Sequence, residues 1–365
     1  MTSYNSLEDG FVTFDPKNMP FRRLGPSGLR VPLFSMGSWL TIGNKVGTDP
    51  AKDIIKVAFE NGINMFDTAE GYNAGGAEFE LGRIIKELKF RRSDIIVTTK
   101  IFFGTHKGPN STGLSRKHII EGTRESLQRL QLDYVDIIFA HRPDPTVPIE
   151  ETVRAFNFVI EKGWAFYWAT SEWSAAQIEE AHHVATRLNL IPPIADQCQH
   201  HMFHRERPEK EYLPLYKNYT YGTTAWSVLA GGLLTGKYNN GIPEDSRYAV
   251  HKGDWGVWAQ HLLSEEGQKK VAKVKELTKI AEQDLQCSVT QLALAWVAKV
   301  NPYTSTVILG ATKPEQVIEN LGAIDVLSKL TPEIVEKIER VLDNKPTPIA
   351  VVARTPYDKN FHALA

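Results

Sequence analysis

Four side chains that can donate, accept or steer a proton follow apolar segments of the chain. They are Asp67 and Tyr72 in NMFDTAEGY (64–72), Lys100 at the end of VTTK, and His141 at the end of YVDIIFAH. A free tyrosine has a pKa of ~10, and a nearby ammonium would lower it. With Asp67 as counter-ion for Lys100 and His141 orienting a carbonyl oxygen, such a group suits protonation of an oxygen when hydride reaches a carbonyl carbon. The alternative is a structural Asp–Lys ion pair with an unrelated polar histidine.

These four residues need a framework that brings separate segments to one opening. A short hairpin is expected in FRRLGPSGLR, with GPSG as its turn. Eight apolar segments then read as strands, at residues 31–37, 63–69, 94–100, 134–141, 165–171, 194–199, 222–229 and 305–311. In a closed barrel of parallel strands, side chains at the strand ends converge at one mouth.

Amphipathic helical patterns separate most of these strands. They cover residues 49–62, 115–132, 149–163, 174–190, 265–284, 288–300 and 313–324. Asp49 and Ser115 are expected N-terminal caps, and Gly163 is an expected C-terminal cap. The alternation predicts an α/β fold, a (β/α)8 TIM barrel with an N-terminal β-hairpin and a long loop after strand seven. A doubly wound open sheet is disfavoured because no Gly-x-Gly-x-x-Gly follows any strand.

Composition excludes several classes of protein. The chain has 365 residues, 42% hydrophobic and 23% charged, and its 43 acidic residues nearly balance 42 basic ones. No basic block points to nucleic acid, and no apolar run is long enough to span a membrane. Cys198 and Cys287 are too few for a disulfide framework, so a reducing, cytoplasmic setting is expected.

Three parts of the chain are expected to differ in role. Residues 1–20 form a polar N-terminal extension, residues 21–344 the barrel, and residues 345–365 a C-terminal tail. Residues 230–264, called the lid segment below, have no strand pattern and are rich in Gly, Asn and Lys. A connection of that length is usually functional, so a lid over the barrel mouth is expected.

Several long motifs resemble one enzyme family. GINMFDTAEGY, VTTK, YVDIIFAHRPD, ATSEWS and ILGATKPEQVIEN are similar to segments of the aldo-keto reductases, particularly the β-subunits of voltage-gated potassium channels and related microbial reductases. The likeness covers residues 21–345. It implies that Tyr72 is the general acid, that Lys100 and Asp67 tune it, and that His141 positions the substrate carbonyl.

The resemblance also implies a nicotinamide cofactor across the barrel mouth. Ser171 and Gln197 are expected to bind the carboxamide, Trp226 to stack on the nicotinamide, and backbone amides at Ser227, Leu229 and Gly231 to follow the pyrophosphate. A wider set completes the expected cofactor contacts: Ser38, Trp39, Asp67, Lys237, Arg247, Gly310, Thr312, Gln316, Glu319 and Asn320. A helix beginning near Thr312 and the charges of Arg247 and Lys313 favour NADP(H) over NAD(H).

Some positions depart from the channel-subunit pattern. His141 replaces the asparagine usual in animal channel β-subunits, which favours a working reductase. Glu172 stands where an arginine is typical, Lys45 where a glutamine is usual and Asp245 where a tyrosine is usual. The effect of these departures on cofactor affinity stays open.

The expected function is therefore NADPH-dependent reduction of small aldehydes or ketones, with Tyr72 as the proton donor. The alternative is an NADPH-binding regulatory β-subunit that docks on a potassium channel or similar partner and turns over little. A third reading is a barrel enzyme acting on sugar phosphates without nicotinamide. A homo-oligomer, tetrameric by analogy with channel subunits, is expected from the resemblance alone.

Histidine and tryptophan clusters are weaker signals. His182–His183 and His200, His201 and His204 are expected to face solvent, and no metal site is expected because no Cys or carboxylate pattern completes one. Trp39, Trp173 and Trp226 near strand ends are candidates for an aromatic pocket. Trp164, Trp168 and Trp296 are expected in packing.

Overall fold

Eight parallel strands close into a barrel within the part of the chain described by the computed structural model, residues 10–39, 42, 48–250 and 254–347. The strand order around the barrel is β10-β3-β4-β5-β6-β7-β8-β9. Their bounds are β3 Phe34–Gly37, β4 Met65–Asp67, β5 Ile96–Ile101, β6 Val135–Ala140, β7 Ala165–Ser171, β8 Ala195–Gln199, β9 Gly222–Trp226 and β10 Thr304–Leu309. The predicted (β/α)8 barrel is confirmed.

A two-stranded antiparallel hairpin, β1 (Phe21–Arg23) and β2 (Arg30–Pro32), precedes the barrel. The predicted strand 31–37 was too long, because residues 31 and 32 pair with the hairpin and the barrel strand begins at Phe34. Hairpin residues Leu24 and Val31 pack with inward-facing Met65 and Ile137. The hairpin therefore closes the end of the barrel opposite the strand C-termini.

Gly25 allows this close approach. It has φ 54°, and a Cβ there would lie 2.1 Å from the carbonyl oxygen of Ile194. We expect Gly25→Ala to lower the free energy of unfolding by about 3 kcal/mol, from overpacking and left-handed strain. Urea denaturation of the variant measures this. Gly28→Ala, where a Cβ meets nothing within 4 Å, is the matched control, and an equal loss in both variants would contradict the packing argument.

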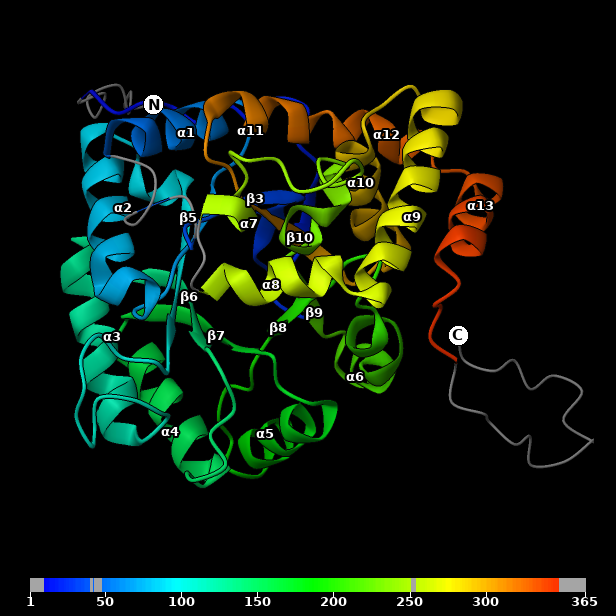
Figure 1. The fold of residues 1–365 in the computed structure, drawn as a ribbon. Coiled ribbons are helices and arrows are strands. Elements are labelled where there is room, and N and C mark those ends of the chain that lie inside the picture. Colours follow the sequence, from blue (N-terminus) through cyan, green and yellow to red (C-terminus); the bar gives the residue numbers. More distant parts are fainter. Residues whose placement is uncertain (1–9, 40–41, 43–47, 251–253, 348–365) are drawn as a thin grey trace, which may run out of the picture.

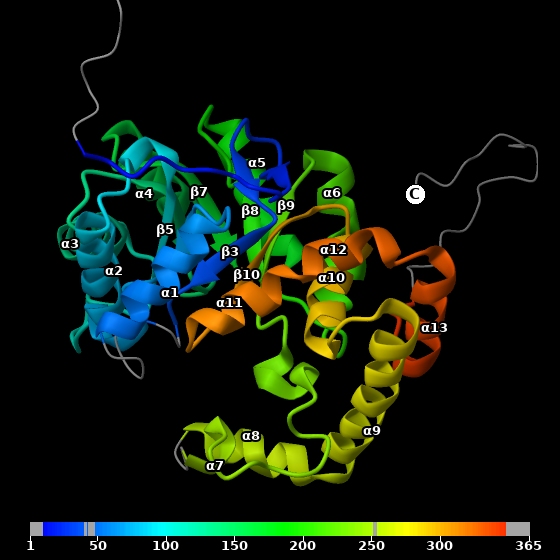
Figure 2. The ribbon, with the colours of Figure 1, turned by 90° about the horizontal axis from the view of Figure 1, so that it is seen from above.

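Helices surround the barrel, as Figures 1 and 2 show. Those that follow the barrel strands or extend the outer ring are α1 Thr48–Glu60, α2 Gly76–Glu87, α3 Arg116–Leu130, α4 Ile149–Glu161, α5 Ala175–Arg187, α6 Leu213–Tyr219, α9 Glu265–Lys279, α10 Val289–Val300, α11 Pro314–Leu321, α12 Ala323–Lys329 and α13 Pro332–Leu342. Short helical turns are η1 Tyr72–Gly75, η2 Arg92–Asp94, η3 Arg207–Glu211 and η5 Ile280–Leu285. None of the helices within the described ranges has the length and apolar character needed to cross a bilayer.

The helix predictions were correct where the apolar stripe was long. The Ser115 hydroxyl accepts a hydrogen bond from the His118 amide and caps α3, as expected. Gly163 follows α4 with φ 70°, also as expected. Asp49, predicted as a cap, instead lies in the first turn of α1. Helices α2, α6 and α13 were not predicted.

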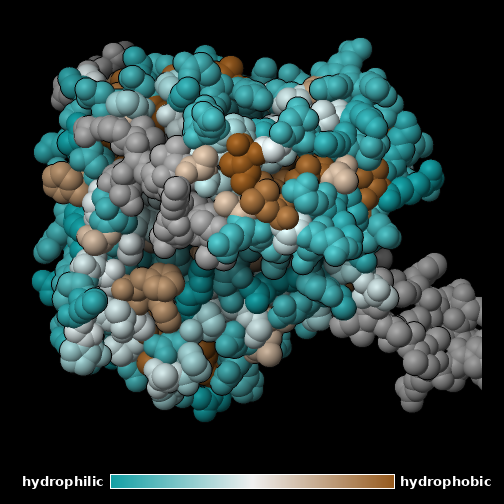
Figure 3. Space-filling view, viewed as in Figure 1, coloured by the Kyte–Doolittle hydropathy of each residue, from teal (hydrophilic) through white to brown (hydrophobic). Residues whose placement is uncertain are grey.

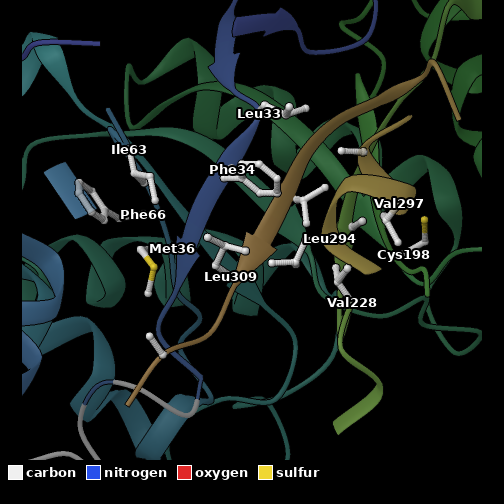
Figure 4. Close-up of a cluster of buried hydrophobic side chains, with 14 of the residues drawn as sticks. Leu33, Phe34, Met36, Ile63, Phe66, Cys198, Val228, Leu294, Val297 and Leu309 are labelled. Carbon is white, nitrogen blue, oxygen red and sulfur yellow. The ribbon is translucent and has the colours of Figure 1, made fainter. Parts of the chain in front are cut away.

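The main hydrophobic core lies between the outer face of the barrel and the helices. Figure 4 shows Phe34, Met36 and Leu309 on neighbouring strands, with Leu294 of α10 close by. All four side chains are buried. This shell holds the strands in register, and therefore also holds the residues at their ends.

The lid segment (230–264) contains helical turns, which the sequence reading did not anticipate. It includes η4 (Ala230–Thr235), α7 (Arg247–Val250) and α8 (Asp254–Leu263). Figures 1 and 2 show these elements in front of the C-terminal ends of the strands. Its predicted position over the barrel mouth agrees with the structure.

Candidate active site

The alternation of side chains along each strand produces a polar layer above an apolar one. Successive residues of a strand point to opposite faces, so Asp67 shares the inward face with Met65, and Lys100 shares it with Ile96. Met65 and Ile96 belong to the apolar cluster at the hairpin end. The inward residues at the other end are polar: Asp67, Thr98, Lys100, His141, Ser171 and Gln197. Figure 3 shows that this face of the molecule has a hydrophilic hollow near its centre.

Lys100 and Asp67 form a buried ion pair in this layer. The Nζ of Lys100 lies 2.5 Å from Oδ2 of Asp67 and donates to the carbonyl of Thr68 at 2.7 Å. Thr98 and Gln197 donate to the other carboxylate oxygen at 2.6 and 3.1 Å. Burial opposes the charge on Lys100, but Asp67 and Tyr72 outweigh it and raise its pKa above the usual value. Lys100 is therefore held as an ammonium.

Tyr72 lies directly beside this ammonium. The Nζ of Lys100 is 4.9 Å from the centroid of the Tyr72 ring. Burial raises the pKa of the Tyr72 phenol and outweighs the opposite effect of Lys100. The expectation of a lowered phenol pKa was therefore wrong for the protein without ligands, because it left out desolvation. Tyr72 is a protonated phenol at neutral pH, as a proton donor must be.

His141 completes the group from the end of β6. Its ring is 5.7 Å from the Tyr72 ring, centroid to centroid, in an edge-to-face arrangement. Burial, assisted by the charges of Lys100 and Arg142, holds the His141 pKa well below its ordinary value. Its Nδ1 is buried without a hydrogen-bond partner in the structure. A neutral imidazole carries one ring N–H that can donate a hydrogen bond to a carbonyl oxygen.

A strained turn fixes Tyr72 in place. Asn73 and Ala74 have φ values of 51° and 48°, and Gly75 has φ 89°. Consecutive left-handed residues are unfavourable for side chains with a Cβ, and such strain is concentrated at functional sites. Gly75 has a φ that strains any residue with a Cβ, and a Cβ there would also lie 2.6 Å from the Arg129 side chain. The turn directs the phenol back over Lys100.

Most residues expected around the nicotinamide gather at the same opening. Ser171 donates to the carbonyl of Gln197 at 3.0 Å, and Gln197 donates to Asp67. The Trp39 ring lies 6.4 Å from Tyr72 and 6.3 Å from Trp226. Ser38 donates its amide to the Asp67 carbonyl at 2.9 Å, and its hydroxyl is buried without a partner. Unsatisfied buried polar atoms here suit a polar planar ligand.

The backbone after β9 has the form of an anion-binding concavity. Leu229 has φ −93° and is followed by left-handed Ala230 (φ 49°) and Gly231 (φ 67°). Ser227 is also left-handed, with φ 58°. The Ala230 amide donates to the Ser227 carbonyl and the Gly232 amide to the Leu229 carbonyl, each at 2.8 Å, which leaves the amides of Leu229 and Gly231 as the candidates to face a phosphate. The residues present therefore fit the diphosphate of a dinucleotide.

The residues expected at the adenosine end lie on segments that leave the neighbouring strands β9 and β10. Lys237 is exposed after η4, and Arg247 begins α7, although its side chain lies outside the described part. Gly310 and Thr312 follow β10, and Gln316, Glu319 and Asn320 lie on α11. The Thr312 amide and hydroxyl both donate to the Gln316 carboxamide. Lys45 lies outside the described residues.

Two buried or partly buried glutamates at the mouth were not assigned roles by sequence reasoning. Glu70 accepts from the amides of Phe102 and Gly104, at 2.7 and 2.9 Å, and lies 3.0 Å from His118. It therefore fixes the loop that places Phe103 against His141, with ring centroids 4.9 Å apart. The sequence signal that could have pointed to Glu70 is its place between the small residues Ala69 and Gly71. The second, Glu172, lies directly after β7 and accepts a hydrogen bond from the Trp226 indole at 2.8 Å.

Two expectations about tryptophan and histidine exposure need correction. Trp173 is buried, so it does not line the opening, whereas Trp168 and Trp296 are buried as expected. His182, His200 and His201 are buried and not solvent-facing. The prediction was wrong because the polar residues next to these histidines in the sequence gave no sign of their packing against aromatic rings, such as His182 on Tyr219. In the described ranges no three His, Cys, Asp or Glu side chains are grouped to hold a metal.

The buried His201 predicts a pH dependence of stability. Burial lowers its pKa to about 3, so the unfolded chain binds more protons than the folded one below its unfolded pKa of ~6.5. Stability is therefore lost as pH falls from about 6.5 toward 3, by up to ~1.4 kcal/mol per pH unit. We expect a shallower loss for His201→Gln in urea titrations. His183→Gln, at an exposed position, should keep the wild-type slope, and identical slopes in all three would contradict this.

Comparison with known proteins agrees with this architecture. The Aldo/keto reductase family model matches residues 34–343, and the chain belongs to this family. A Schizosaccharomyces pombe protein named as a voltage-gated potassium channel subunit beta is 54% identical over 338 residues, covering 92% of this chain and 97% of its own length. An Arabidopsis thaliana protein named in the same way is 50% identical over 329 residues, covering 90% and 98%.

Proposed function

We propose that this protein reduces small aldehydes or ketones to alcohols with NADPH. The observation that carries the proposal is the buried Lys100–Asp67 pair beneath a protonated Tyr72, with a neutral His141 beside it. When bound, the nicotinamide supplies a hydride to the carbonyl carbon.

Side chains of this protein then bind and protonate the carbonyl oxygen. His141 holds the carbonyl oxygen by a hydrogen bond, and Tyr72 gives its proton as negative charge develops there. The Lys100 ammonium stabilises the phenolate that remains, since an adjacent positive charge favours the ionised form. Asp67 keeps Lys100 charged and in position through the 2.5 Å contact. Ser171, Gln197 and Trp226 would hold the carboxamide and face of the nicotinamide.

Charge supports NADPH as the preferred cofactor. Exposed Lys237, together with Lys313 at the start of α11, places positive charge on the segments after β9 and β10. Arg247, which lies in the lid segment, is the third basic residue on the segments after these two strands. A 2′-phosphate gains from such neighbours, while NADH has no group to use them.

A steady-state assay tests the proposal. Purified protein is mixed with NADPH or NADH and a panel of reactive aldehydes and ketones, and loss of the nicotinamide absorbance is followed. We expect turnover of at least one carbonyl compound. We also expect NADPH to bind at least about tenfold more tightly than NADH. Absence of turnover over the whole panel would refute the reductase function.

A regulatory role is the second candidate, and the names of the two relatives favour it. In this case the protein would be a cytoplasmic, homo-oligomeric subunit that binds NADPH and docks on a potassium channel or similar partner. Tight NADPH binding with no turnover, together with unchanged binding in Tyr72→Phe, would support it. Mass measurement of the native assembly tests the expected tetramer.

A further inference from the structure

Glu172 occupies an unusual turn directly after β7. It has φ 60°, a left-handed conformation that costs about 1 kcal/mol for a residue with a Cβ. Its amide donates to the Gln197 carbonyl and to Oδ1 of Asp196, each at 3.2 Å, and the Trp173 amide lies 3.3 Å from Oδ2 of Asp196. Asp196 is fully buried. The turn is therefore held in its strained form by β8.

The Glu172 side chain ties three neighbouring strand ends together. One carboxylate oxygen accepts from the Gln199 amide at 2.6 Å and from the indole N–H of Trp226 at 2.8 Å. The other oxygen accepts from Arg207, which belongs to η3 after β8. Since the Glu172 side chain is only 18% exposed, solvent competes weakly for these contacts. The indole plane of Trp226 is consequently fixed by a charged acceptor.

We propose that Glu172 is a positioning residue that orients Trp226 for stacking on the nicotinamide. This inference rests on the proposed use of NADPH. The motif resemblance leads one to expect arginine at this position, and a guanidinium has only donors, so it could not accept the indole N–H. In this chain Glu172 accepts the indole N–H of Trp226, and the Arg207 guanidinium in turn donates to Glu172.

The competing explanation is an ion pair that merely stabilises the fold. Both explanations predict some loss of stability when Glu172 is removed. Only the positioning role predicts that the effect on NADPH depends on Trp226. It also predicts that an uncharged acceptor at residue 172 preserves most of the effect, since the indole N–H needs an oxygen but no ion pair.

The environment of Trp226 can be measured without cofactor. The chain has eight tryptophans, so protein labelled with 5-fluorotryptophan gives overlapping ¹⁹F signals, and the signal missing in Trp226→Phe identifies this residue. We expect Glu172→Ala to shift or broaden that signal. Glu172→Gln keeps an acceptor oxygen and should shift it less. Arg207→Gln, which leaves the carboxylate on the indole, is the matched control for loss of the ion pair.

The same variants are titrated with NADPH by its fluorescence, and melting temperatures are recorded. We expect Glu172→Ala to weaken binding roughly tenfold, as for loss of a hydrogen bond to a charged group, and Glu172→Gln to stay within about threefold of wild type. In the Trp226→Phe background, Glu172→Ala should weaken binding by less than about twofold.

Two results would overturn the inference: an unchanged Trp226 signal in Glu172→Ala, or an equal loss of NADPH affinity in both backgrounds. If Glu172→Ala does not fold, Glu172→Gln and Arg207→Gln provide the comparison. In that case, an Arg207→Gln protein whose Trp226 signal shifts as much as that of Glu172→Gln would also overturn it. Wild-type protein that binds no NADPH removes the proposed function and the cofactor part of this inference, while the ¹⁹F signals still decide whether Glu172 positions Trp226.

Discussion

Replacement of Tyr72 with phenylalanine is expected to lower kcat for carbonyl reduction by about 10²–10⁴-fold. The phenol is the protonated group beside Lys100, and burial keeps its pKa above the ordinary value, so its loss removes the proposed proton donor. The phenylalanine ring preserves the contacts with Trp39 and His141. NADPH affinity should therefore stay within about threefold of wild type.

The control for Tyr72→Phe is Tyr303→Phe. Tyr303 stacks on Tyr216 with ring centroids 4.3 Å apart, just before β10 and at the far end of the barrel from the site. Its kcat should equal that of wild type. Equal activity of Tyr72→Phe and wild type would show that another group protonates the oxygen, and a parallel fall in both variants would indicate a general effect of losing a hydroxyl.

Replacement of Lys100 with methionine is expected to reduce both activity and stability. Lys100 is fully buried, and its loss leaves the Asp67 carboxylate buried without a counter-ion. Breaking a buried pair in this way costs about 3–5 kcal/mol of unfolding free energy. We also expect kcat to fall by at least about 10², because no ammonium remains to stabilise the phenolate. Urea denaturation and steady-state assays measure the two effects.

A double variant separates charge from packing in this prediction. Asp67→Asn combined with Lys100→Met removes both charges, while residue 67 keeps an oxygen for Thr98 and Gln197. It should recover much of the lost stability but none of the activity. Lys117→Met is the control, since Lys117 and Glu121 form an exposed pair worth ~0.5 kcal/mol. A Lys100→Met protein as stable as wild type would contradict the buried-pair account.

The meeting of Asp67, Tyr72, Lys100 and His141 at one opening was predictable from sequence because strand periodicity and chain order determine their positions. Lys100 is the last inward-facing residue of β5, and His141 directly follows β6. Parallel strands bring such residues to one mouth of the barrel. The eight strands were found for the same reason. The exact strand ends were less predictable, since residues 31 and 32 pair with the hairpin and β9 ends at Trp226.

Other features depend on packing between distant segments, which local pattern does not report. The direction of the Tyr72 pKa shift depends on whether burial or the Lys100 charge has the larger effect, and only the three-dimensional structure shows which one it is. The polar residues next to His201 and Trp173 in the sequence gave no indication that both side chains are buried. Glu172 was singled out as a departure from a family pattern, but its role depends on Trp226, which lies 54 residues further along the chain. The helical turns of the lid segment were concealed by its glycines.

Transfer of isotope from cofactor to product shows whether hydride reaches the carbonyl carbon and whether Tyr72 is needed for that step. Wild-type protein and Tyr72→Phe are each mixed with NADPH carrying deuterium at the transferable C4 position and with an aldehyde that wild type reduces, and the alcohol is analysed by mass spectrometry. We expect one deuterium on the carbinol carbon with wild type, and the same alcohol formed at least about 10²-fold more slowly by Tyr72→Phe. Alcohol without deuterium, or deuterated alcohol formed at the same rate by both proteins, would contradict it.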